Sequence, residues 1–147
     1  KILYKQYIED YSVESTFQAI KKVCNFSSEP IDAVICGSGA IAETVAQYFD
    51  DGNYTKHIIV IGQDLSAKTS ELMAVGKLDM SVYKPVKDLA EEAINVALDL
   101  AKRGHLREGN YKYVNNGRSE NPAILLPSKV VTSQNLSEYF DTKAKIR

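Results

Sequence analysis

Long hydrophobic runs and an excess of charge of either sign are both missing from this sequence. No apolar stretch approaches the roughly 20 residues that a helix needs to cross a bilayer, so we expect no membrane span. Lysine plus arginine number 18 and aspartate plus glutamate 19, with no basic stripe, which disfavours a nucleic-acid partner. Of the 147 residues, 44% are hydrophobic and 25% charged, which is typical of one globular domain.

Cysteine and histidine are also scarce, with two of each. The spacing of Cys24 and Cys36 fits no zinc or redox motif, and we expect both to be free thiols that pack as small hydrophobic side chains. His57 falls at the start of a predicted strand and His105 just past the end of a predicted helix. The sequence therefore predicts neither a metal site nor a catalytic histidine.

Short apolar segments alternate with amphipathic ones along most of the chain. The apolar segments predict strands at 2–8, 32–36, 57–62 and 78–83, and the amphipathic ones predict helices at 12–24, 39–50, 66–74 and 86–103. After Gly104 the pattern predicts a turn at 115–121, short strands at 123–126 and 129–131, and a brief helix at 135–141. Such alternation is typical of an α/β fold, a doubly wound parallel sheet with helices on both faces.

The predicted helix at 86–103 carries a continuous apolar stripe, formed by Leu89, Ala93, Val96, Ala97 and Leu100. Its opposite side is charged. An apolar stripe of this length must lie against another element, and this sheet is one candidate.

The carboxyl ends of parallel strands are where open α/β sheets bind ligands. That rule selects four places: Tyr7 to Tyr11, Gly37 to Gly39, Gln63 with Asp64, and Tyr83 with Lys84. Their hydroxyls, carboxylate, ammonium and aromatic rings suit a neutral polyol, because carboxylates accept from vicinal hydroxyls and rings lie against the C–H face of a sugar.

Several of these residues also have a purely structural interpretation. Ser38 and Asp64 could each cap the helix that follows it, and Lys84 could be a solvated surface lysine. Tyr7 and Tyr11 could be aromatic residues at a strand edge. No histidine is evidently placed to activate Ser38, so a nucleophilic role for its hydroxyl is disfavoured.

Residues 37–42 read GSGAIA, a match to the glycine-rich fingerprint of dinucleotide-binding folds. Asp64 follows at the end of the next predicted strand, about where a ribose-binding acid would lie. The fingerprint usually marks the first strand-to-helix turn of its domain, whereas here a strand and a helix precede it. A small Rossmann-type oxidoreductase, or its cofactor-binding fragment, therefore remains an alternative.

Four longer stretches carry a family resemblance, namely IDAVICGSGAIA at 31–42, IIVIGQD at 58–64, VGKLDMSVYKP at 75–85 and VNNGRSENPAILLPSKVVT at 114–132. With them the chain resembles the C-terminal half of periplasmic sugar-binding proteins of the type I fold. It is most similar to the D-xylose-binding proteins of bacterial ABC importers. This resemblance implies a binding protein without catalytic residues, metal or cofactor, which takes a monosaccharide such as D-xylose or a related pentose.

The resemblance also implies roles for individual residues. The family's sugar-binding aspartate and lysine match Asp64 and Lys84, and its aromatic platform falls on Tyr7. Where the family has Ser-Asn-Asp, this chain has glycine, Ser38 and Gly39, so lost hydrogen bonds should weaken or retune sugar binding. Tyr11, Gly39 and Gln63 are further possible ligand contacts.

The resemblance finally implies an incomplete protein. The sequence starts at Lys1 without a signal peptide, which predicts a processed protein or a fragment. Family members clamp the sugar between two lobes, and the helix that matches 86–103 belongs to the other, N-terminal lobe, which we expect to be missing here. The helix would then pack differently on its own sheet or against a second copy of the chain.

The implied setting is the bacterial periplasm, or an extracellular position at the membrane. There the partner would be an ABC permease or a sensor kinase. A lobe that has lost sugar binding and serves only in protein contacts is the remaining alternative.

Overall fold

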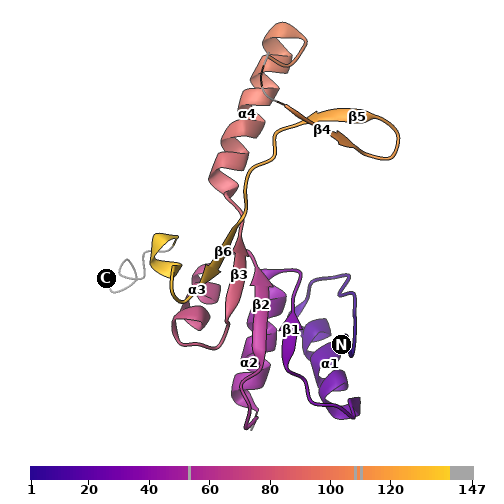
Figure 1. Cartoon of the computed structure of the whole chain (residues 1–147), viewed down its shortest axis with the longest axis vertical. Coiled ribbons are helices and arrows are strands. Elements are labelled where there is room, and N and C mark those ends of the chain that lie inside the picture. The colour runs from indigo at the N-terminus through magenta and orange to yellow at the C-terminus, as the bar shows by residue number, and fades with distance from the viewer. Residues whose placement is uncertain (53, 108, 110, 140–147) are drawn as a thin grey trace. The chain divides into compact units, whose positions relative to one another are not determined.

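The computed structural model describes residues 1–52, 54–107, 109 and 111–139 (Figure 1). The chain divides into two compact units. The first comprises Lys1–Tyr83 and the chain from Lys129 onward, and the second is Lys84–Ser128.

The first unit is built around a four-stranded sheet with the order β1-β2-β3-β6. β1, β2 and β3 run parallel, and β6 is antiparallel to β3. The strands are β1 (Ala33–Ile35), β2 (Ile59–Gln63), β3 (Met80–Tyr83) and β6 (Lys129–Thr132), and the helices are α1 (Val13–Phe26), α2 (Gly39–Asp51), α3 (Ala67–Ala74) and the 3-10 turn η1 (Leu136–Glu138). Tyr83 and Lys129 lie opposite each other in the register of β3 and β6.

Serine residues begin all three α-helices of the first unit. Ser12, Ser38 and Ser66 have extended backbones, and each hydroxyl accepts the backbone N–H three residues further on. Such caps satisfy one of the donors that a helix leaves unpaired at its first turn. The helix starts expected from the sequence are confirmed, and so is the interpretation of Ser38 as a cap.

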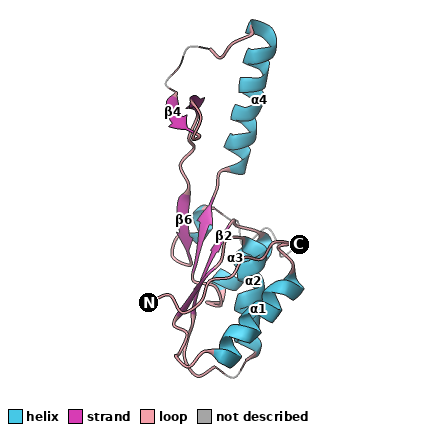
Figure 2. Ribbon diagram, turned by 90° about the vertical axis from the view of Figure 1, so that its right-hand side faces the viewer, coloured by secondary structure: helices cyan, strands magenta, loops and turns pink. Residues whose placement is uncertain are grey.

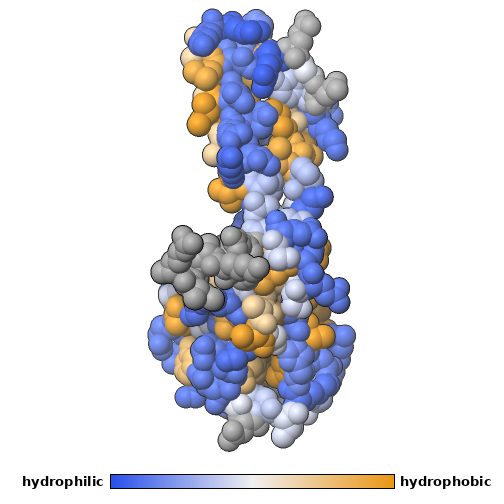
Figure 3. All heavy atoms as spheres, turned by 90° about the vertical axis from the view of Figure 1, so that its left-hand side faces the viewer, coloured by the Kyte–Doolittle hydropathy of each residue, from blue (hydrophilic) through white to orange (hydrophobic). Residues whose placement is uncertain are grey.

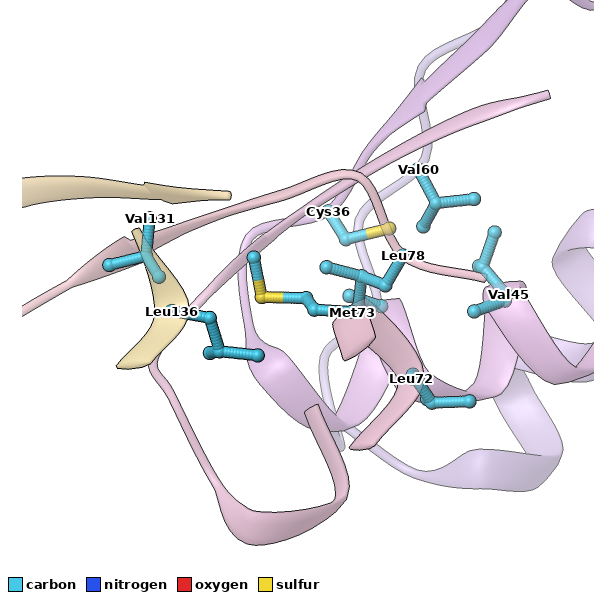
Figure 4. Packing of buried hydrophobic residues seen from close by; sticks show 10 residues of the cluster. Cys36, Val45, Val60, Leu72, Met73, Leu78, Val131 and Leu136 are labelled. Carbon is cyan, nitrogen blue, oxygen red and sulfur yellow. The ribbon is translucent and has the colours of Figure 1, made fainter. Parts of the chain in front are cut away.

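The core lies between the sheet and the helices α2 and α3 (Figure 4). Met73 of α3 is fully buried, and the exposed fraction of Leu78, Val60 and Val131 is at most 1%. Gly62 of β2 lies where α2 crosses the sheet, and a Cβ atom there would stand 2.7 Å from the Cβ of Ala42. The close approach of helix and strand therefore requires glycine at this position.

Cys36 packs within this core, and both cysteines are free thiols, as expected. Burial raises the pKa of the Cys36 thiol to about 12 from an ordinary value of 9.0. The unfolded chain therefore loses this proton first, and we expect the free energy of unfolding to fall by about 1 kcal/mol as the pH rises from 9 to 10. Urea unfolding of the protein and of Cys36→Ala at both pH values measures this. An equal decrease in the two proteins would contradict it.

The second unit consists of α4 (Val86–Arg103) and a hairpin of β4 (Lys112–Asn115) and β5 (Glu120–Ala123). α4 follows Pro85 and ends at Gly104, whose φ of 73° is the left-handed conformation that glycine adopts easily. Leu89, Ala93 and Val96 line an apolar hollow of about 240 Å³ together with residues around the hairpin. None of the eighteen residues of α4 is buried, and Figure 3 shows hydrophobic side chains at the surface of this unit.

Three expectations about the elements are wrong. Residues 2–8 form no strand, because a strand requires a paired neighbour and none of the described strands pairs with them. The strand predicted at 123–126 is shifted, because β5 covers Glu120–Ala123 and pairs antiparallel with β4, a strand that the sequence did not predict. The helix predicted at 135–141 is a 3-10 turn at Leu136–Glu138, and its last residues lie outside the described part.

The α/β class with a largely parallel sheet is confirmed. Figure 2 shows α1, α2 and α3 on the same side of the sheet. On the opposite side, Ile35 is 80% exposed, so the second layer of helices expected there is not seen among the described residues. Also within the described residues, no helix combines the length and the apolar character needed to cross a membrane.

Candidate ligand-binding site

The carboxyl ends of β1, β2 and β3 meet at one edge of the sheet, because the three strands are parallel and in register. This arrangement brings together the residues that the sequence placed after β1 and at the end of β2. A Cβ atom on Gly39 would lie 3.8 Å from the Cβ of Asp64 and 3.0 Å from the backbone oxygen of Gln63. Gly39 is buried in this contact, so a side chain there would press directly on the β2–α3 loop.

Asp64 has a constrained backbone. Its φ is 73°, a left-handed conformation that costs about 1 kcal/mol or more in a residue with a side chain. Its N–H donates to the Val82 carbonyl at 3.0 Å, and its own carbonyl accepts the hydroxyl of the fully buried Ser81 at 2.5 Å. These bonds hold the residue in a conformation that it would not adopt unaided, and such strain is concentrated at functional sites.

The alternative role of Asp64 as a helix cap is wrong. Ser66 caps α3, with its hydroxyl accepting the N–H of Thr69 at 2.9 Å. The Asp64 side chain is therefore not required to begin this helix. Ser38, by contrast, accepts the N–H of Ile41 at 3.3 Å, and its hydroxyl can still donate one hydrogen bond to a ligand.

A carboxylate that the sequence reasoning missed supports this loop. Glu43 of α2 accepts hydrogen bonds from the hydroxyls of Ser66 at 2.5 Å and of the fully buried Thr69 at 2.6 Å. Glu43 thus ties the N-terminal half of α2 to the start of α3, which follows soon after Asp64. The contact joins residues 23 and 26 positions apart, and no local pattern could have indicated it.

We expect Glu43→Ala to lower the free energy of unfolding by about 2 kcal/mol, since hydrogen bonds to a charged group contribute about 1.5–3 kcal/mol. Glu43→Gln keeps one acceptor and should cost less. Urea unfolding, together with hydrogen exchange at the Thr69 and Ser70 amides, measures the loss. Unchanged exchange at these amides in Glu43→Ala would show that the carboxylate does not hold the loop.

Tyr7 and Tyr11 do not lie at a strand end, because residues 2–8 form no strand. Tyr7 is 73% and Tyr11 63% exposed, and the Lys5 ammonium lies 5.2 Å from the centre of the Tyr7 ring. Tyr11 also has a positive φ of 50° and donates its N–H to the Ile8 carbonyl in a turn. Lys84 follows Tyr83, the last residue of β3, and is the first residue of the second unit.

A polar hollow of about 200 Å³ lies at the opposite, amino-terminal end of the strands. Its basic side chains already have acidic partners. The Lys77 ammonium lies 2.6 Å from Asp50, and His57 Nε2 lies 2.7 Å from Asp79, whose second oxygen accepts the Val60 N–H. In the part of the chain that the structure describes, no group of three or more His, Cys, Asp or Glu residues could hold a metal ion.

Residues 1–105 match the family model described as a periplasmic binding protein domain. The chain belongs to the periplasmic binding protein family. A D-xylose-binding periplasmic protein of Haemophilus influenzae is 27% identical over 151 residues, which cover 99% of this chain and 45% of the relative. The resemblance on which the sequence analysis relied is therefore confirmed.

Solved structures show that this periplasmic binding protein has the type I fold of the family. A carbohydrate transporter solute binding protein from Chloroflexus aurantiacus, in complex with D-glucose, matches 88% of this chain and 40% of its own with a TM-score of 0.76 at 22% identity. A chain of the XylFII–LytSN complex matches this chain over 85% of its residues and over 38% of its own, with a TM-score of 0.65 at 18% identity. The chain spans less than half the length of the relatives that it matches.

Proposed function

We propose that this protein is the sugar-recognising part of a solute-binding protein, and that its ligand is a monosaccharide such as D-xylose or a related pentose. The observation that carries the proposal is the strained Asp64 at the shared carboxyl edge of the parallel strands, in contact with the buried Gly39. The D-xylose-binding relative in H. influenzae supports the ligand class. The glucose complex from C. aurantiacus makes a hexose the next candidate.

The proposed binding needs hydrogen bonds and ring contacts only. Asp64 accepts from two vicinal sugar hydroxyls, and the Ser38 hydroxyl and the Lys84 ammonium each donate a hydrogen bond to the sugar. Gln63, Tyr7 and Tyr11 are further proposed contacts, with the two exposed tyrosine rings free to lie against a sugar face. No bond is made or broken, so we propose a binding protein and not an enzyme.

A two-lobe protein is part of the proposal. The second unit, with the exposed apolar side chains of α4, would belong to the N-terminal lobe that the relatives' greater length provides. Closure of the lobes on the sugar would then signal to a membrane partner in or at the periplasm, either an ABC permease or a sensor kinase. The XylFII–LytSN complex is a precedent for a similar protein bound to a second protein. Association of two copies through α4 is the alternative.

An amide-resolved NMR titration with D-xylose, D-ribose, D-glucose and NAD tests the proposal, because chemical shifts report even millimolar binding by half of a cleft. We expect a pentose to shift the amides of Ser38, Gly39, Gln63 and Asp64. Shifts confined to Gly37–Ala42 with NAD would instead support the dinucleotide enzyme. An absence of shifts with all four compounds would favour a lobe that serves only in protein contacts.

A further inference from the structure

A very short loop connects Asp64 to α3. β2 ends at Gln63, and Leu65 is the only residue between Asp64 and Ser66, the cap of α3. Leu65 is itself packed against the hydrophobic core. The position of Ser66 therefore fixes where the chain must go after Asp64, and a contact that holds Ser66 also restricts the backbone of Asp64.

Glu43 holds this cap from a different helix. The hydroxyls of Ser66 and Thr69 each carry one proton, so both can donate to Glu43 Oε1 at the same time, at 2.5 and 2.6 Å. The Ser66 hydroxyl oxygen meanwhile accepts the Thr69 N–H at 2.9 Å. One oxygen atom of α2 thus receives both side chains that form the start of α3.

α2 contacts the β2–α3 loop at two places. Gly39 and Glu43 are four residues apart, so they lie on the same face of α2. A Cβ atom on Gly39 would lie 3.5 Å from Thr69 Oγ1 and 3.0 Å from the backbone oxygen of Gln63. The helix therefore contacts the beginning of the loop through Gly39, beside Asp64, and its end through Glu43.

The left-handed backbone of Asp64 depends on such contacts. A strained conformation persists only where the surrounding structure holds it on several sides. From β3, the Val82 carbonyl and the Ser81 hydroxyl bind the two peptide groups of Asp64. From α2, Glu43 fixes the residues that follow. Without this second attachment the loop could relax, and the Asp64 carboxylate would move with it.

We propose that Glu43 is a positioning residue of the sugar site. It makes no contact with the sugar. By holding Ser66 and Thr69 it keeps Asp64 in the conformation that presents its carboxylate to the ligand. This inference rests on the proposed function for the role of Asp64 as the sugar acceptor. It adds a second carboxylate, which determines the affinity through the first.

Sugar affinity in three variants tests the proposal. Released from Glu43, Asp64 has other backbone conformations available, which are favoured about 10-fold over a left-handed one, so Glu43→Ala should weaken D-xylose binding about 10-fold. Glu43→Gln keeps an oxygen that accepts both hydroxyls and should bind within about 2-fold of the unaltered protein. Asp79→Ala is the matched control, because its carboxylate supports the Val60 N–H at the amino-terminal end of β2. It should cost stability and leave the affinity unchanged.

A double variant tests whether Glu43 acts through Asp64. If it does, adding Glu43→Ala to Asp64→Asn should weaken binding much less than Glu43→Ala does alone, since the carboxylate to be positioned is already missing. Isothermal titration of the four variants with D-xylose and D-glucose measures these losses. Losses that multiply, or equal affinity of Glu43→Ala and Asp79→Ala, would overturn the proposal.

Hydrogen exchange of the Asp64 amide supplies a measurement without sugar. This amide donates to the Val82 carbonyl, and we expect it to exchange about 10-fold faster in Glu43→Ala than in Asp79→Ala, and at an unchanged rate in Glu43→Gln. Equal exchange in Glu43→Ala and Asp79→Ala would overturn the proposal whether or not a sugar binds. Faster exchange in a protein that binds none of the sugars would refute the proposed function alone, with the positioning of Asp64 by Glu43 upheld.

Discussion

Asp64→Asn should weaken binding of the preferred sugar by about 10- to 100-fold, the loss that corresponds to one or two hydrogen bonds to a charged acceptor. Asparagine has the shape of aspartate and is among the few residues that tolerate a left-handed backbone, so the φ of 73° at this position should be retained. The loss would therefore report the carboxylate and not a rearranged loop. Isothermal titration with D-xylose and D-glucose measures the effect.

Two further variants separate binding from folding at this position. Asp64→Gly removes the side chain and relieves the backbone strain, so it should bind sugar as poorly as Asp64→Asn while unfolding at an equal or higher urea concentration. Asp88→Asn removes an exposed carboxylate from the first turn of α4 and should leave sugar affinity unchanged. If Asp64→Asn binds sugar as tightly as the unaltered protein, Asp64 is not the acceptor and the proposed site is wrong.

Gly62→Ala should lower the free energy of unfolding by about 1–3 kcal/mol, the usual cost of adding a methyl group to a well-packed interior. The new Cβ atom would stand 2.7 Å from the Cβ of Ala42, whose position is fixed by the α2 backbone. Either α2 or β2 must therefore move. Urea unfolding followed by far-ultraviolet circular dichroism, with hydrogen exchange of the β2 amides, measures the change.

Gly37→Ala is the matched control for this variant. A Cβ atom on Gly37 would meet no atom within 4 Å, so stability should change by less than about 0.5 kcal/mol. Equal stability of the two variants would show that α2 and β2 are not packed as closely as the structure has them.

The helix boundaries could be predicted because their causes are local. Ser12, Ser38 and Ser66 begin helices, and Gly104 ends one, through bonds to residues a few positions away or through the residue's own backbone freedom. Residues 2–8 have an equally clear strand composition and yet form no strand. A strand depends on a neighbour that may lie anywhere in the polypeptide, and its own residues cannot supply one.

The candidate site was predictable in part for a similar reason. The rule about carboxyl ends selected Ser38, Gly39, Gln63 and Asp64, and the parallel register brings these ends to one edge. The tertiary contacts of Glu43 with the β2–α3 loop could not be read from either segment alone. The sequence placed Tyr7 and Tyr11 at the end of a predicted strand, and this prediction failed because residues 2–8 form no strand.

The pairing of Tyr83 with Lys129 has a consequence for the modularity of this chain. The polypeptide leaves the sheet at the first of these residues and re-enters it at the second, and the two are direct neighbours on antiparallel strands. A two-residue hairpin turn could bridge that distance as well as the whole of Lys84–Ser128 does. The pairing of β3 with β6 therefore does not depend on the second unit, and Lys84–Ser128 is an insertion between two neighbouring strands.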